Sequence, residues 1–122
     1  DDGQPWGRTR TSGLDQANLL RQVLLGEWGP LDSAGRDLAL GLMTSVVPSQ
    51  TWGVTAGVPA GRLVAQKNGF AAGTTNSVGV IHDAGGDPDY VVVVLTFGWP
   101  TWEVGVPVVE EIASWVAASL AD

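Results

Sequence analysis

The segment around Lys67 contains the first residues that could take part in catalysis or binding. Lys67 is the only lysine among the 122 residues. It follows an apolar run and precedes Asn68 and Gly69, and a glycine in a strand lets a ligand or another backbone approach closely. A lysine at a strand edge also discourages aggregation. The triplet Lys-Asn-Gly alone therefore leaves a functional and a protective interpretation open.

His82 and three aspartates form a second group of chemically capable residues. His82 and Asp83 could act as a base and its orienting carboxylate, but adjacent strand residues point to opposite faces. We therefore expect a solvated histidine in a turn. The spacing of Asp83, Asp87 and Asp89 lacks the pattern of a calcium loop and its distal glutamate, which predicts a solvated acidic loop.

Tryptophans and glycines supply two weaker candidates. Trp99 and Trp102, in the segment WPTW, could form an exposed aromatic platform for a sugar or peptide. Core packing at the junction of a strand and a helix is the favoured alternative. Gly57, Gly61 and Gly73 do not form a phosphate-binding loop, because no Gly-Lys-Ser/Thr follows them.

The composition indicates one globular domain and excludes several kinds of site. With 122 residues, 44% of them hydrophobic, the chain suits a single core. A net charge of −7 disfavours nucleic-acid binding. The absence of cysteine and the single histidine exclude thiolate chemistry and a multi-histidine metal centre, so we expect no metal and no cofactor. No apolar run approaches the roughly 18 residues of a membrane-spanning helix, and residues 1–12 are too polar for a signal peptide.

The elements that must position these residues begin with two helices. Residues 1–11 are polar and contain turn formers, which predicts a loop. Ser12 followed by Asp15 resembles an N-cap with an acidic first turn, and the apolar spacing predicts a helix over 13–25 that ends at Gly26. A turn over 26–30 leads to a second helix, which begins at residue 32 or 33 and ends before Pro48.

A loop, three strands and a closing helix follow. Residues 48–61 alternate small and apolar residues with turn formers, which predicts an ordered loop over the core. Runs rich in β-formers predict strands over 63–68, 76–82 and 90–97, the last one central and covered on both faces. Pro107 is typical of the first turn of a helix. The sequence thus predicts an α/β (α+β) fold with the order α-α-β-β-β-α around an antiparallel sheet.

In this order of parts the chain resembles the carboxy-terminal portion of the serine β-lactamase and penicillin-binding-protein superfamily. The resemblance covers the chain from Thr9 onward and is carried by the following segments: LLRQVLLG, WGVTAGVPAG, VAQKNGF, NSVGVIHDAGGDPDYVVVVLTFG and EEIASWVAASL. The third motif of the family is Lys-Thr/Ser-Gly on a strand that lines the active site. Lys67-Asn68-Gly69 matches this motif at two of its three positions.

The resemblance implies roles for four residues. Lys67 would support the electrostatics of the site and bind the substrate carboxylate, and the backbone N–H of Phe70 would provide half of the oxyanion hole. Asn68 and Gly69 would contact the substrate. Two departures weaken β-lactam recognition: Asn68 replaces a hydroxyl residue, and Val78 lies about where many class A β-lactamases place an arginine.

Two family motifs are absent from this sequence. The nucleophile motif Ser-x-x-Lys is missing, since Val64 lies three residues before Lys67, and so is Ser-Asp-Asn. No glutamate precedes the first predicted helix, where the resemblance would place a deacylating carboxylate. We therefore expect residues 12–122 to form the carboxy-terminal half of one β-lactamase-like domain, with the nucleophile outside this chain.

Three interpretations remain open. In the first, the full domain is a serine hydrolase that cleaves a β-lactam or a related amide or ester through an acyl-enzyme. In the second, it is a catalytically inactive β-lactamase-fold binding protein of the bacterial cell envelope. In the third, the chain is a complete small α/β domain and the triplet is coincidental. The first two imply a secreted or cell-envelope protein, a small-molecule or peptidoglycan-like ligand, and a partner that is either the missing amino-terminal half, possibly a separate chain, or a second copy.

Overall fold

The computed structural model describes residues 9–26 and 29–120 and confirms the predicted class and element order. Most of the predicted amino-terminal loop and part of the turn over 26–30 lie outside the described residues. The elements run as follows: α1 (Gly13–Leu24), α2 (Ser33–Thr44), a short 3-10 helix η1 (Pro48–Gln50), β1 (Leu63–Ala71), β2 (Thr74–His82), β3 (Pro88–Phe97) and α3 (Trp102–Ser119).

Side-chain caps fix the start of both amino-terminal helices. Ser12 Oγ accepts a hydrogen bond from the N–H of Asp15 at 3.2 Å, and the Asp15 carboxylate accepts one from the N–H of Ser12 at 2.9 Å. The hydrogen bonds that this carboxylate accepts from the N–H and the hydroxyl of Ser12 hold the pKa of Asp15 below its usual range. Asp32 caps α2 through the N–H of Gly35 at 2.8 Å. The predicted N-cap at Ser12 and the predicted start of the second helix are therefore confirmed.

The three strands form one antiparallel sheet in the order β1-β2-β3. Ala71 pairs with Thr74, so β1 and β2 are joined by a two-residue turn in which Gly73 has a φ of 71°. Because of this turn, β1 ends later and β2 begins earlier than predicted. The pairing extends to residues next to the turn, which the pattern of apolar residues does not mark as strand. The prediction that residues 90–97 form the central strand is wrong among the described residues: β2 is central and β3 lies at an edge.

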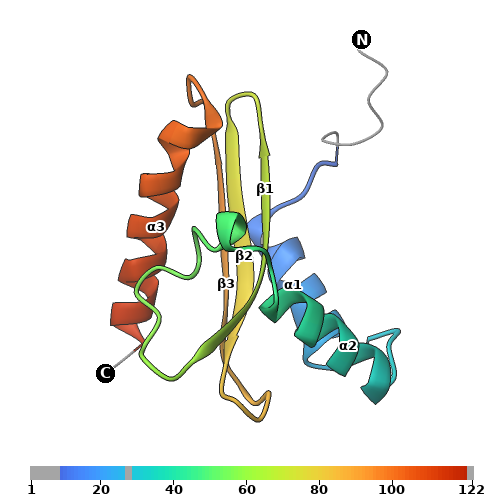
Figure 1. Ribbon diagram of the computed structural model, residues 1–122. Helices are drawn as coiled ribbons and strands as arrows, with labels where there is room; N and C mark the ends of the chain where they lie inside the picture. Colours follow the sequence, from blue (N-terminus) through green and yellow to red (C-terminus); the bar gives the residue numbers. More distant parts are fainter. Residues whose placement is uncertain (1–8, 27–28, 121–122) are drawn as a thin grey trace.

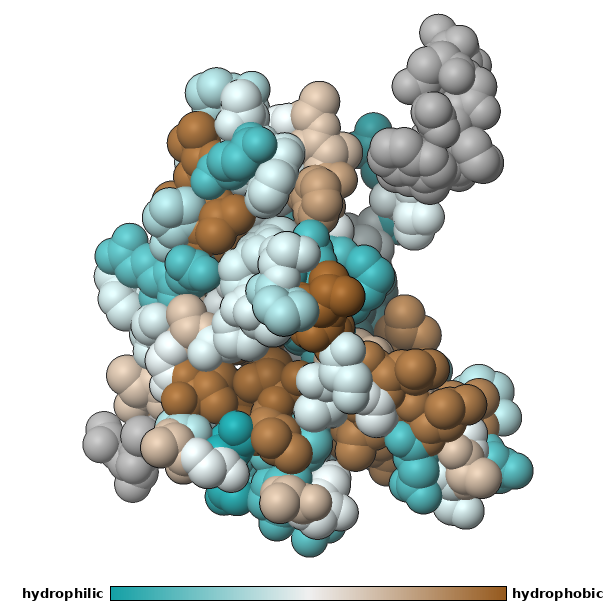
Figure 2. Space-filling view, in the orientation of Figure 1, coloured by the Kyte–Doolittle hydropathy of each residue, from teal (hydrophilic) through white to brown (hydrophobic). Residues whose placement is uncertain are grey.

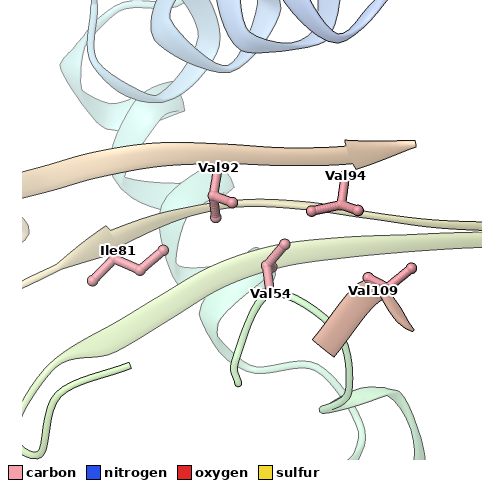
Figure 3. Packing of buried hydrophobic residues seen from close by; sticks show 5 residues of the cluster. All are labelled: Val54, Ile81, Val92, Val94 and Val109. Carbon is pink, nitrogen blue, oxygen red and sulfur yellow. The ribbon is translucent and has the colours of Figure 1, made fainter. Parts of the chain in front are cut away.

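Helices cover both faces of the sheet (Figure 1), with α1 and α2 on one face and α3 on the other. The loop after η1 also lies on the α3 face and contributes Val54 to the core there. Figure 3 shows this core, in which Val54, Ile81, Val92, Val94 and Val109 pack together. Leu20 and Leu24 of α1 pack on the opposite face against Ala65 and Val80. Coverage on both sides explains why β3 is an unbroken apolar run even at an edge.

Helix α3 begins one turn earlier than Pro107 predicts. The helix starts at Trp102, which places Pro107 inside it. Proline lacks the N–H that would bond to the carbonyl of residue 103, but tertiary contacts hold the extra turn: the carbonyl of Trp102 accepts a hydrogen bond from Thr75 Oγ1 at 2.6 Å. No helix in the described part of the chain is both long enough and apolar enough to cross a membrane.

Candidate functional site

The unpaired edge of β1 carries the main-chain groups on which the expected site depends. β1 pairs only with β2 in the described sheet, so half of its N–H and C=O groups point away from the sheet. Lys67 Nζ donates a hydrogen bond to the carbonyl oxygen of Asn68, which places that carbonyl on the unpaired side. Since both main-chain groups of a residue point the same way and direction alternates along an antiparallel strand, the N–H of Phe70 also points outward.

Strand geometry divides the four expected site residues between the two faces of the sheet. Lys67 and Gly69 lie on the α1–α2 face, whereas Asn68 and Phe70 lie on the α3 face. The Lys67 side chain is exposed, and a Cβ added at Gly69 would meet open space. Val78 is the register partner of Lys67 and is half-buried. The positive charge and an open backbone position therefore lie together on one face.

The buried side chain of Asn68 forms hydrogen bonds to other residues of the chain. Its side chain is 5% exposed, and its Nδ2 donates to the carbonyl oxygens of Gln50 at 2.8 Å and Trp52 at 3.3 Å. Its Oδ1 accepts a hydrogen bond from Ser77 Oγ at 2.6 Å. These bonds tie the loop after η1 to the α3 face of β1 and β2.

The same loop is held at two further points. The N–H of Val54 donates to Ser77 Oγ at 3.0 Å, and the N–H of Gly53 donates to Glu110 of α3 at 3.3 Å. Gly53 has a φ of 85°, and a Cβ there would lie 2.4 Å from Ser77 Oγ, so only glycine fits. The sequence marks this position by a glycine next to Trp52, but it does not reveal the contact with Ser77.

An aromatic cluster, formed by Trp52, Phe70 and Trp102, lies beside the Phe70 amide. The rings of Phe70 and Trp102 stack with centroids 4.4 Å apart, and Trp52 lies about equally far from both, at 6.2 Å from Phe70 and 6.0 Å from Trp102. Trp102 is half-buried and stacks on Phe70 at the start of α3, but it belongs to neither hydrophobic core cluster, so the predicted core packing is not what the described residues show. Trp99 is also half-buried, and its Nε1 donates to Thr96 Oγ1 at 2.8 Å.

His82 is not the solvated turn residue expected from the sequence. It ends β2 and is 3% exposed. Its Nε2 lies 3.1 Å from Thr44 Oγ1, and its Nδ1 lies 2.7 Å from the carbonyl oxygen of Asp83. The prediction is wrong because α2 covers the end of the strand, a contact between distant segments that local turn residues do not indicate.

The acidic segment after β2 stabilises its own turn. The Asp83 carboxylate accepts hydrogen bonds from the N–H groups of Asp87 at 3.0 Å and Gly85 at 2.8 Å. These bonds, led by the one from Asp87, lower the pKa of Asp83. Asp89 forms an ion pair with Arg62 at 2.7 Å. In the described ranges no three His, Cys, Asp or Glu residues are grouped so that they could hold a metal ion.

Solved structures similar to this chain include β-lactamases and a penicillin-binding protein. A class A β-lactamase from Mycobacterium abscessus has 32% identity and a TM-score of 0.78, over 92% of this chain and 42% of that one. An ancestral class A β-lactamase of Gram-negative bacteria has 29% identity and a TM-score of 0.74, over 98% and 44%. PBP-A, at 22% identity and a TM-score of 0.74 over 91% and 40%, shares the fold.

The chain spans less than half the length of each of these structures. No curated protein matches it. The model of the β-lactamase enzyme family matches residues 3–117. The described fold, with its three helices and antiparallel sheet, agrees with that match. This chain therefore belongs to the β-lactamase enzyme family.

Proposed function

We propose that this chain is the carboxy-terminal part of a serine β-lactamase-like hydrolase domain. The domain would hydrolyse a β-lactam or a related amide or ester through an acyl-enzyme. The observation that carries this proposal is the outward N–H of Phe70, on the unpaired edge of β1 that also bears Lys67. A donor and a positive charge at one strand edge suit a reaction in which an oxygen gains negative charge.

Each residue of the edge has a distinct part in the proposed reaction. When a nucleophile attacks the substrate carbonyl, the Phe70 N–H donates to the oxygen that becomes negative. The Lys67 ammonium raises the local positive potential and binds the substrate carboxylate. Gly69 leaves space for the substrate to lie along the strand. Asn68 acts as a positioning residue, because its side-chain bonds hold the loop at Gln50 and Trp52.

The nucleophile belongs, in this proposal, to an amino-terminal half of the same domain, in the same or a separate chain. The length of the matched structures supports this, since 42% of the Mycobacterium abscessus enzyme corresponds to this chain. Exposed leucines on α1 and α2 also support it: Leu14, Leu38 and Leu42 are 70%, 64% and 66% exposed. Figure 2 shows apolar side chains gathered over α2. A surface of this kind is typical of one that packs against another element.

Phe70→Pro and Phe70→Ala, compared in the protein produced from its complete gene, test the role of the amide. Both variants lose the ring, but only proline also removes the N–H. Edge strands accept proline where the N–H faces outward, and circular dichroism checks that both variants fold. We expect a fluorescent penicillin to acylate the proline variant about 10²–10³-fold more slowly than the alanine variant. Equal rates in two folded variants would exclude the amide from the oxyanion hole.

A second candidate function is a binding protein with the β-lactamase fold and no catalysis. Val78 opposite Lys67, about where many class A β-lactamases place an arginine, favours it. Such a protein would hold a β-lactam or a peptidoglycan-like ligand reversibly, so that dialysis removes the fluorescent penicillin completely. Persistent labelling that survives denaturation excludes this candidate. Under either proposal we place the protein outside the cell or in the bacterial cell envelope.

A further inference from the structure

The aromatic cluster lies at the end of the sheet where the proposed oxyanion donor is found. The β1–β2 hairpin and the start of α3 lie side by side at this end (Figure 1). Phe70 is 41% exposed, although its ring stacks on Trp102 at 4.4 Å with an interplanar angle of 29°. One side of the cluster is thus packed, and part of the Phe70 ring remains open to a ligand.

Buried polar residues of the sheet bond to the main chains that carry the other two rings. Thr75 is fully buried, and its hydroxyl donates to the carbonyl of Trp102 at 2.6 Å. Asn68 donates to the carbonyl of Trp52 at 3.3 Å. The main chains of both tryptophans are therefore anchored to the sheet, and their rings pack on each other and on Phe70. Groups that are already positioned lose less entropy on binding.

The aromatic cluster lies close to the proposed oxyanion donor because both include Phe70. The amide N–H and the ring of Phe70 belong to one residue, so a carbonyl oxygen bound to the N–H at about 2.9 Å lies within about 7 Å of the ring. An acyl group attached to that carbonyl reaches the exposed part of the ring with one or two further atoms. Planar rings stack on such a surface with offset or tilted geometry.

We propose that the cluster of Trp52, Phe70 and Trp102 binds an aromatic acyl side chain of the substrate and so determines specificity. This inference rests on the proposed function and names its substrate class: amides or esters whose acyl group carries an aromatic ring. The contact selects for aromatic over aliphatic acyl groups of similar size. The Phe70 ring is the member of the cluster that meets the ligand.

Two unreactive probes test this inference in the protein produced from its complete gene. N-phenylacetylglycine and N-hexanoylglycine both offer a carbonyl and a carboxylate, and they differ in the acyl group. Their dissociation constants are measured by NMR titration, with the indole N–H signals of Trp52 and Trp102 as reporters. We expect the phenylacetyl probe to bind about two- to tenfold more tightly, and Phe70→Leu, which keeps the N–H, to abolish the difference.

Phe97→Leu is the matched control, because Phe97 is 88% exposed and lies outside the aromatic cluster. This variant should keep the wild-type ratio of the two dissociation constants. Equal binding of the two probes, no binding of either, or loss of preference in Phe97→Leu would each overturn the inference. Failure of the proposed function gives a different result: the aromatic preference persists, but fluorescent penicillin never labels the protein.

Discussion

Replacing Asn68 by threonine restores the Lys-Thr-Gly triplet of the family, yet we expect it to destabilise this protein. From the sequence alone the change returns a hydroxyl to the substrate site. In the structure the Asn68 side chain instead ties the loop to the sheet through Gln50, Trp52 and Ser77. The variant Asn68→Thr therefore tests which of two roles Asn68 has: binding the substrate or positioning the loop.

The magnitude follows from the three hydrogen bonds of this side chain. A threonine hydroxyl donates one hydrogen bond and can accept others, but it is a single atom on a shorter side chain, so we expect it to keep one of these three bonds. The carbonyl of Gln50 retains the hydrogen bond from Gln66 Nε2 at 2.7 Å, whereas the carbonyl of Trp52 loses the donor that Asn68 supplies. Two lost bonds at about 1 kcal/mol each, with part of the desolvation cost of a buried group, lower the free energy of unfolding by about 2–3 kcal/mol.

Urea-induced unfolding followed by circular dichroism measures this loss. Asn18→Thr is the matched control, because Asn18 is exposed on α1 and the two residues have similar helix propensities; it should change stability by less than about 0.5 kcal/mol. A double-mutant cycle with Ser77→Ala should give a coupling of about 1 kcal/mol between residues 68 and 77. If Asn68→Thr matches the control, or the coupling vanishes, the loop does not depend on Asn68 and the reasoning fails.

Three further predictions follow from single positions. Lys67→Ala should slow acylation by fluorescent penicillin while changing the urea midpoint little, because the side chain is exposed; an unchanged rate removes Lys67 from the site. Gly53→Ala should lower the free energy of unfolding in urea by about 2–4 kcal/mol, because Gly53 has a positive φ and its added Cβ would lie 2.4 Å from Ser77 Oγ. Gly61→Ala is the control: Gly61 has a φ of 86° but open space around it, so the free energy of unfolding should fall by less than half as much. Main-chain hydrogen bonds lower the pKa of Asp83, so its stabilising contribution is present above the unfolded pKa of about 3.9 and is lost as pH falls through the folded value. Asp83→Asn should therefore reduce the acid dependence of the urea midpoint, and an unchanged dependence would contradict the lowered pKa.

Most elements of the fold can be predicted from residues that are close together in the sequence. Ser12 with Asp15 gave the start of α1, since a capping box is formed by residues three apart. The number and order of the strands are predictable because turn residues bound each β-rich run. Errors occurred where distant segments meet. Pro107 predicts the first turn of α3, but the helix begins at Trp102, whose carbonyl accepts a hydrogen bond from Thr75.

The contacts around the candidate site could be predicted only in part. Alternation along β1 already implies that Lys67 and Asn68 lie on opposite faces. Which face the loop after η1 covers depends on Val54 and Gly53, whose partners lie more than twenty residues away. The burial of His82 has the same origin, since Thr44 is 38 residues distant. Sequence periodicity contains no information on such pairs unless homologous sequences can be compared.

The structure changes what the asparagine in the triplet signifies. Read from the sequence, Asn68 weakens β-lactam recognition, because it replaces a substrate-binding hydroxyl residue. In the structure its amide bonds to the protein's own loop, so the substitution removes neither the Lys67 charge nor the outward N–H of Phe70. Asn68 therefore cannot by itself distinguish a hydrolase from a binding protein. That distinction depends on the main chain of Phe70, where a proline variant can remove the donor while the preceding glycine and the unpaired strand edge allow the fold to persist.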